Sequence, residues 1–165
     1  MPVKFDERAR AEAIGHLVMK WQDAVQAYDE AVGEIAGLNG AERRCLAFLH
    51  DGPKTAGAIA AATGLTPAAI TSLVDRLEAR GFLRRTRSAE DRRKVLVEGG
   101  PAARELAARY YEPLGRRGTE ILSGYSESAL DAVERFLSDA LRLQDEQLTL
   151  VRAAEHSATP TSPTE

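Results

Sequence analysis

The chain of 165 residues has only one cysteine, Cys45, and its aromatic residues make up only 5% of the sequence. A single thiol excludes an internal disulfide and a site built from several thiolates, which is typical of a reducing compartment. The sequence also lacks a run of about 18 apolar residues for a membrane span, and its N-terminal stretch lacks the apolar core of a signal peptide. We therefore expect a cytoplasmic protein with no membrane partner.

An excess of positive charge is also absent, because 22 lysines and arginines stand against 25 aspartates and glutamates, giving a net charge of -3. This balance excludes a uniformly basic surface, so any contact with nucleic acid must come from a localised patch. Such a patch is present at residues 84–97, RRTRSAEDRRKVLV. The length fits one small domain with appended helices, and abundant alanine with few aromatics favours a mainly helical fold.

Long helical patterns lie at both ends of the chain. Residues 8–37 are assigned to an N-terminal helix, because apolar residues recur there at alternating spacings of three and four. Residues 100–153 are assigned to C-terminal helices, in which Pro113 should cause a kink or an interruption and Ser126 should cap the last helix. The polar, proline-rich residues 154–165 are predicted to be a disordered tail. The recurring apolar residues of the first helix are Ile14, Val18, Trp21, Val25, Tyr28, Val32 and Ile35.

Residues 38–99 read as two short helices joined by a turn and followed by a hairpin. Leu38-Asn39-Gly40 separates them from the long first helix, and a further short helix precedes Asp51-Gly52-Pro53. The turn contains Gly64, and Thr66 with Pro67 begins the second helix of the pair. Two β-prone runs, Phe82–Arg87 and Lys94–Val97, flank a polar tip. The apolar side of that second helix carries Ile70, Leu73, Val74 and Leu77, and its other side carries Ala69, Thr71, Ser72, Asp75 and Arg76.

A helix-turn-helix with a basic hairpin beside it is a winged helix-turn-helix, which is typical of DNA-binding proteins. The major groove admits a helix whose outward side chains are short, while arginines at a hairpin tip can reach phosphates or the minor groove. We therefore predict sequence-specific binding of double-stranded DNA. The residues predicted to contact DNA are Thr55, Thr66, Pro67, Ala69, Thr71, Ser72, Arg76, Arg87, Asp91, Arg92, Arg93 and Lys94.

Two motifs in this region resemble those of the MarR family of bacterial transcription regulators. They are the recognition-helix pattern T-x-L-V-D-R-L-E-x-R-G at Thr71–Gly81 and the wing pattern D-R-R-x-V-x-V at Asp91–Val97. The resemblance covers about residues 11–151. The chain departs from the family pattern at residues 98–101, EGGP, where members commonly have Leu-Thr and a helix N-cap.

The resemblance implies a mainly α fold with a small β-hairpin wing and long dimerisation helices. It also implies an obligate homodimer on a pseudo-palindromic operator, most often a repressor, whose DNA affinity is lowered by a small ligand. Within the wing, it implies that Arg93 enters the minor groove and that Asp91 orients the hairpin. His16, Met19 and Arg109 are the ligand-binding candidates, because family ligands usually sit between the dimerisation helices and the winged head.

Other functions have less support in the sequence. The Lys54-Thr55 pair lacks the glycine spacing of a phosphate loop, no serine sits in a nucleophile elbow, and the histidines lack metal-ligand spacing. We therefore predict no enzymatic activity, no cofactor and no metal site. Two alternatives stay open: an architectural DNA-binding protein without ligand control, and a small-molecule-binding or enzymatic dimer that does not bind DNA. Cys45, among apolar neighbours, is interpreted as a core residue rather than a redox sensor.

Overall fold

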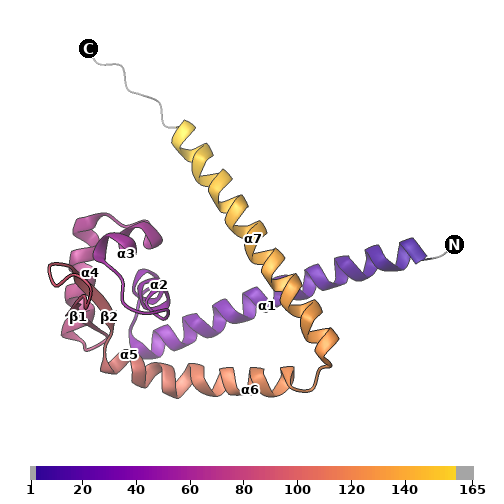
Figure 1. Cartoon of the computed structure of the whole chain (residues 1–165), viewed down its shortest axis with the longest axis horizontal. Coiled ribbons are helices and arrows are strands. Elements are labelled where there is room, and N and C mark those ends of the chain that lie inside the picture. The colour runs from indigo at the N-terminus through magenta and orange to yellow at the C-terminus, as the bar shows by residue number, and fades with distance from the viewer. Residues whose placement is uncertain (1–2, 159–165) are drawn as a thin grey trace, which may run out of the picture. The chain divides into compact units, whose positions relative to one another are not determined.

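The computed structural model describes residues 3–158, with side chains from residue 7 to residue 154. The fold is mainly helical with one two-stranded hairpin among the described residues, as predicted (Figure 1). The chain divides into two compact units, and the first ends at Pro113 and the second begins at Leu114. The elements are α1 (Val3–Ala36), α2 (Gly40–Phe48), α3 (Ala56–Thr63), α4 (Pro67–Ala79), β1 (Leu83–Arg87), β2 (Val95–Gly99), α5 (Pro101–Leu106), the π-helix η1 (Ala107–Tyr111), α6 (Glu112–Leu122) and α7 (Glu127–Ala158).

The junction between α1 and α2 differs in detail from the prediction. Gly37, with φ of 59°, ends α1, and the amide of the next residue, Leu38, donates to the Gly33 carbonyl at 2.8 Å. Glycine adopts this left-handed conformation without steric cost. Asn39 belongs to the following helix, where its side chain accepts from the Glu42 amide while the Glu42 carboxylate accepts from the Asn39 amide. This reciprocal cap fixes the start of α2.

The turn of the helix-turn-helix and the start of its second helix lie where the sequence predicted them. The Thr55 hydroxyl accepts from the Ala58 amide at 3.2 Å, and the Thr66 hydroxyl accepts from the Ala69 amide at 3.3 Å, so the two threonines are the N-caps of α3 and α4. Gly64 ends α3, and Pro67 takes the first position of α4, where a missing amide hydrogen costs nothing. Local capping chemistry therefore sets the length of both helices.

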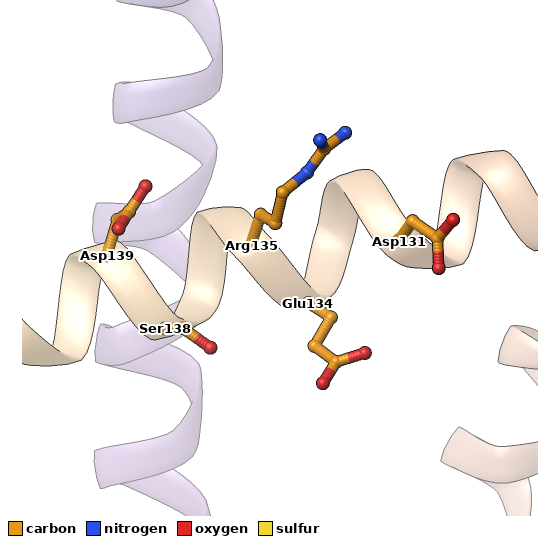
Figure 2. Close-up of a pocket in the computed structure, with 5 residues that line it drawn as sticks. All are labelled: Asp131, Glu134, Arg135, Ser138 and Asp139. Carbon is orange, nitrogen blue, oxygen red and sulfur yellow. The ribbon is translucent and has the colours of Figure 1, made fainter.

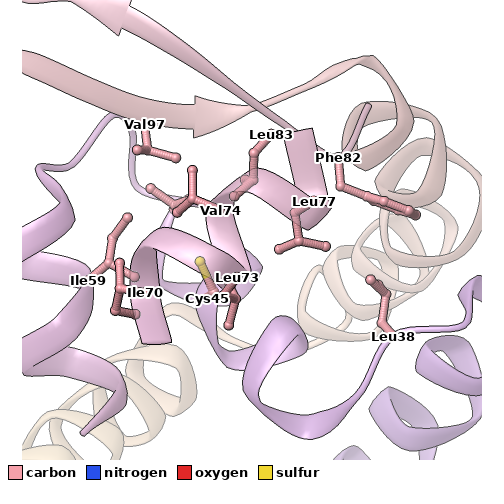
Figure 3. Packing of buried hydrophobic residues seen from close by; sticks show 11 residues of the cluster. Leu38, Cys45, Ile59, Ile70, Leu73, Val74, Leu77, Phe82, Leu83 and Val97 are labelled. Carbon is pink, nitrogen blue, oxygen red and sulfur yellow. The ribbon is translucent and has the colours of Figure 1, made fainter. Parts of the chain in front are cut away.

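The apolar core of the winged head lies between α4, the other short helices and the hairpin. The predicted inner side of α4 is confirmed, because Ile70, Leu73, Val74 and Leu77 are all buried. Figure 3 shows these side chains together with Ile59 of α3 and Cys45 of α2, and with residues from both strands of the hairpin. The cluster consists of Leu38, Cys45, Leu49, Ile59, Ile70, Leu73, Val74, Leu77, Phe82, Leu83 and Val97.

The wing is an antiparallel hairpin in which Leu83 pairs with Gly99 and Arg87 with Val95. The first strand agrees with its predicted range to within one residue, but the second begins and ends later than Lys94–Val97. Lys54 extends the sheet beside β2, since its amide donates to the Val97 carbonyl at 3.0 Å and its carbonyl accepts from the Val97 amide at 2.8 Å. This bridge joins the loop before α3 to the wing.

The exit from the wing explains the departure from the family pattern at EGGP. The Gly100 amide donates to the Phe82 carbonyl at 2.7 Å, and the Ala102 amide donates to the Gly81 carbonyl at 3.0 Å. This close approach leaves no room for a side chain, because a β-carbon at Gly100 would overlap the Gly81 carbonyl oxygen. Gly100 therefore lets α5 start directly against the end of α4.

The helix after the wing accommodates Pro113 through a π-helical turn rather than a break. Proline has no amide hydrogen, and its ring crowds the carbonyl four residues earlier. In η1 the Glu112 amide donates instead to the carbonyl of Ala107, five residues back, which widens the turn just before the proline. Pro113 is followed by regular helix, so the kink or interruption predicted at the proline takes the form of a π-helical turn just upstream of it.

Hydrogen bonds from tyrosines join η1 to α1 within the same chain. The Tyr28 hydroxyl donates to the Tyr110 carbonyl at 2.7 Å, and the Tyr111 hydroxyl donates to the Asp29 carboxylate at 2.7 Å. The two rings of Tyr28 and Tyr111 meet edge to face, with centroids 6.0 Å apart. Arg43 of α2 also pairs with Asp29, at 3.1 Å, so the cluster holds three helices together.

Two predicted boundaries are wrong. The first helix begins at Val3 rather than at residue 8, and α7 continues to Ala158, so residues 154–158 are helical and not part of a tail. Helix propagation adds a hydrogen bond per residue, so a long helix can extend past the residues that show apolar periodicity. The other residues of the predicted tail, 159–165, lie outside the described residues. Ser126 caps α7 as predicted, because its hydroxyl accepts from the Ala129 amide at 3.3 Å.

Replacing Gly100 by alanine should lower the free energy of unfolding by about 2–3 kcal/mol, because the new methyl group forces α5 away from the end of α4. The matched control is Gly57→Ala in α3, where a β-carbon meets nothing within 4 Å. That variant should gain about 0.4–1 kcal/mol through lower entropy of the unfolded chain. Urea titration of both variants measures the difference, and equal stabilities would contradict the close approach at Gly100.

Cys45 is fully buried, and burial, helped by nearby Glu42, raises the pKa of its thiol from 9.0 to about 11. We expect the native thiol to resist alkylation at pH 8 and to react at once in denaturant, because the thiolate is the reactive species. The raised pKa contributes stability below pH 9, and that contribution is lost as the pH rises through 11. Cys45→Ser should cost about 1–3 kcal/mol because serine leaves a buried hydroxyl. Fast native labelling at pH 8 would contradict the core assignment.

Candidate nucleic-acid interface

The outward side of α4 carries short polar side chains directly opposite its buried side. Thr71 and Ser72 are exposed, and Ala69 beside them is partly buried. The Thr71 hydroxyl donates to the Pro67 carbonyl at 3.0 Å, which fixes the position of its methyl group and leaves an oxygen free to accept. A helix surface of this kind allows close approach to an edge of a base pair.

Four of the predicted DNA-contacting residues have structural tasks in this region. Thr55 and Thr66 are helix caps, Pro67 opens α4, and the Ala69 amide completes the cap of that helix. Such a helix N-terminus presents amide dipoles with partial positive charge, which favour a nearby phosphate. These residues therefore shape the start of both helices, and their contact with DNA stays a prediction.

Arg76 points toward the buried carboxylate of Glu42 rather than standing free. Its Nε atom lies 3.6 Å from Glu42 Oε1, although 57% of the Arg76 side chain is exposed. Arg80, one turn further along α4, lies 4.0 Å from the same carboxylate and donates to the Ala36 carbonyl at 2.5 Å and the Gly37 carbonyl at 2.9 Å. Glu42 thus connects the end of α1, the start of α2 and the last turn of α4, and sequence reasoning did not single it out.

The tip of the wing is shaped by its own short polar side chains. The Ser88 hydroxyl accepts from the amides of Glu90 and Asp91 at 3.2 and 3.3 Å. Asp91 in turn accepts from the Arg93 amide at 3.1 Å and from Arg93 Nε at 3.4 Å. The Asp91 carboxylate therefore holds the backbone that presents Arg93, whose side chain is 94% exposed.

The basic residues of the hairpin fall into two groups. Near its base, Arg84 pairs with Glu98 on the opposite strand at 2.7 Å, and Arg85 pairs with two carboxylates of α4. Toward the tip, Arg87, Arg92, Arg93 and Lys94 are exposed, and within the described part of the chain Arg93 alone among these four has an ion pair, with Asp91. The four residues at the tip, here called the tip cations, form the localised positive patch that the sequence predicted.

The candidate ligand residues are not brought together in one cavity. His16 and Met19 are exposed on α1, and the Arg109 guanidinium lies over the Tyr110 ring at 5.4 Å. Figure 2 shows the residues that line a pocket on α7, which are Asp131, Glu134, Arg135, Ser138 and Asp139. A hollow on a single helix has no opposite wall to enclose a small molecule. The three candidates therefore stay predictions.

In the part of the chain that the structure describes, no group of three or more histidine, cysteine, aspartate or glutamate side chains could hold a metal ion. No single described helix is long and apolar enough to cross a membrane, and the one combination that meets the length and composition criteria is the pair α3 and α4, bent by 108°.

Comparison with known proteins agrees with this geometry. Residues 36–94, which include the helix-turn-helix and most of the wing, match the model of the MarR family. A Bacillus subtilis protein described as the uncharacterized HTH-type transcriptional regulator YcgE is 29% identical over 122 residues, which are 73% of this chain and 79% of that protein.

Solved structures of transcriptional regulators share the fold. The regulator Tm0710 from Thermotoga maritima aligns with a TM-score of 0.56 at 21% identity, covering 84% of this chain and 98% of that one. A mutant of MepR from a multidrug-resistant S. aureus clinical isolate aligns with a TM-score of 0.60 at 17% identity, covering 79% and 96%. Residues 36–94 therefore carry a winged helix-turn-helix of the MarR family, and the chain shares the fold of solved transcriptional regulators.

Proposed function

We propose that this regulator binds a pseudo-palindromic operator as a homodimer, with α4 in the major groove and the wing along the phosphates and minor groove. The observation that carries the proposal is the pairing of two neighbouring surfaces. One is the short polar side of α4, with Thr71 and Ser72, and the other is the group of tip cations. Short polar side chains on a helix can contact base edges in the major groove, and the phosphates attract the tip cations.

The distribution of charge supports this orientation. The chain as a whole has a net charge of -3, so attraction to DNA has to come from the tip cations rather than from the general surface. Within the wing, Arg84 and Arg85 are neutralised by carboxylates, whereas the tip cations lie at the end of β1 and in the turn before β2. Positive charge is thus concentrated where a hairpin reaches along a duplex.

The homodimer is supported by apolar side chains that each unit leaves exposed. On α1, the exposed fractions of Leu17 and Trp21 are 64% and 58%, and on α7 those of Leu141 and Val151 are 72% and 58%. A soluble monomer seldom exposes apolar surface of this extent. A second copy offers the same surfaces and so a symmetric way to cover them. Tyr28, predicted to belong to this seam, is partly used within the chain through its bond to Tyr110.

A repressor role in the cytoplasm and control by a small ligand complete the proposal. The support for ligand control is the family match of residues 36–94 together with the polar cluster around Asp29, which joins α1, α2 and η1 near the head. A ligand that separates these helices would change the angle between α1 and the head and so weaken operator binding. His16, Met19 and Arg109 are the candidate contacts on these elements.

Dimerisation through α7 predicts that Leu141→Glu produces a monomer, because a charge placed in an apolar interface is costly to bury. Light scattering at micromolar concentration should give the mass of a dimer for the wild type and of a monomer for the variant. The control Glu146→Gln changes an exposed polar side chain of the same helix and should stay dimeric. A monodisperse wild-type monomer would exclude the homodimer.

Removing side chains from the wing and from α4 should change DNA binding in different ways. Arg92→Ala/Arg93→Ala should weaken binding to all sequences together and flatten the slope of log affinity against log salt by about 0.9 for each lost phosphate contact. Thr71→Ala/Ser72→Ala should instead change which sequences are preferred, since a good base contact discriminates by about 1–3 kcal/mol.

The measurement begins with selection of DNA from a randomised pool by the wild-type protein, followed by titrations of the selected duplex at several salt concentrations. Repeating the selection with each double variant reports its sequence preference. If the wing variant keeps full affinity and the wild-type salt slope, the tip cations are only a solvated surface and the proposed orientation is wrong.

A further inference from the structure

Two carboxylates lie on the side of α4 that faces the wing. Asp75 and Glu78 are three residues apart, so they share one side of the helix. Arg85, the third residue of β1, reaches both: its Nη2 atom lies 2.5 Å from Asp75 Oδ1, and its Nη1 atom donates to Glu78 Oε2. The Arg85 backbone amide also donates to Glu78 Oε1, at 3.1 Å. One residue of the strand therefore makes three polar contacts with α4.

The geometry of these contacts restrains the orientation of β1 relative to α4 as well as the distance between them. The planar guanidinium offers its two terminal nitrogens to two different carboxylates, while the backbone amide binds the second oxygen of Glu78. Such a fork resists rotation of the strand about the helix, which a point charge does not. The hydrogen bond to Asp75, with the nearby charge of Glu78, raises the pKa of Arg85 against the opposing effect of burial.

Arg85 lies farther toward the tip of the hairpin than the buried residue Leu83 at its base. Arg85 pairs with Val97 in the middle of the register, between the buried base at Leu83 and the strand end at Arg87. The apolar core reaches along the hairpin only as far as Val97, since Leu83 and Val97 are buried whereas Val95 is 52% exposed. The contacts of Arg85 are therefore the outermost polar link between the hairpin and α4 that the structure describes.

Arg85 also differs from its neighbour Arg84, which pairs with Glu98 inside the hairpin and makes no described contact with α4. Asp75 lies one turn from Thr71 on the exposed side of α4, where an uncompensated carboxylate would repel phosphate. Arg85 neutralises the charge of Asp75, and its terminal nitrogens are used in the contacts with Asp75 and Glu78.

We propose that Arg85 is a positioning residue that sets the separation of the wing from α4 through Asp75 and Glu78, and does not itself contact DNA. The proposal rests on the proposed function, in which α4 and the wing bind one duplex together. If the wing is already held against α4 in the free protein, binding does not have to order the hairpin. The link therefore lowers the entropy cost of binding and raises affinity without adding a phosphate contact. The same link fixes which groove positions the tip cations reach.

The test compares Arg85→Met, Arg85→Lys and Asp75→Asn, with Arg84→Met as the matched control that removes one arginine from the same strand. Duplexes selected by the wild-type protein are titrated at several salt concentrations. Arg85→Met should lose affinity about tenfold, with a salt slope equal to that of the wild type. Arg85→Lys should lose most of the same affinity although it keeps the charge, and Arg84→Met should stay within about threefold of the wild type.

Asp75→Asn combined with Arg85→Met should bind no more weakly than Arg85→Met alone, because both changes remove the same link. Amide hydrogen exchange of the free protein provides a readout without DNA. Exchange in β1 and β2 should become faster in Arg85→Met and should stay unchanged in Arg84→Met, while thermal unfolding shows whether each variant is folded.

Three results would overturn the proposal. A salt slope flattened by about two units per dimer in Arg85→Met would show a direct phosphate contact instead. Full affinity, or unchanged exchange in the hairpin, would show that the link has no positioning role. Failure of the proposed function looks different, because the wild-type protein would then select no DNA sequence, while the exchange measurement would still report whether Arg85 holds the wing.

Discussion

Burial of one side of α4 is the constraint on which the winged head depends. Ile70, Leu73, Val74 and Leu77 contribute four buried side chains from a single helix, and Ile59, Cys45 and Leu83 close around them from three other elements. With this side fixed inward, the opposite side of the helix has to face solvent, and the strand that follows Gly81 has to run alongside it. Every polar contact described at the interface is built on this arrangement.

Sequence patterns predicted the parts of the fold that depend on local chemistry. The caps at Thr66 and Ser126 were predicted because a side-chain hydroxyl satisfies amides within the same turn. The end of α1 at Gly37 and the π-helical turn before Pro113 were not predicted in detail, because each depends on how backbone carbonyls are arranged in three dimensions. The close approach at Gly100 brings together residues from the end of α4 and the start of α5, which no local pattern contains.

For the site, the sequence indicated which segments carry charge but not how that charge is shared. Arg84, Arg85 and the tip cations look alike in RRTRSAEDRRK, yet only contacts across the hairpin and with α4 separate the paired arginines from the exposed ones. The spacing of Asp75 and Glu78 on one side of a helix was the available signal for Arg85. Glu42 gave little signal, because a glutamate near a helix start is ordinarily a solvated capping residue.

The bonds from Arg80 to the carbonyls of Ala36 and Gly37 have a mechanical consequence. They fasten the last turn of α4 to the end of a helix of 34 residues, which is about 50 Å long at 1.5 Å per residue. Because α1 is held at its C-terminal end, a small rotation there corresponds to a large displacement of its N-terminal end. A tilt of about 5° at the fastened end moves the far end by about 4 Å, and the converse also holds. Displacements of several ångströms near the N-terminus are thereby converted into small rotations of the helix that carries Thr71 and Ser72.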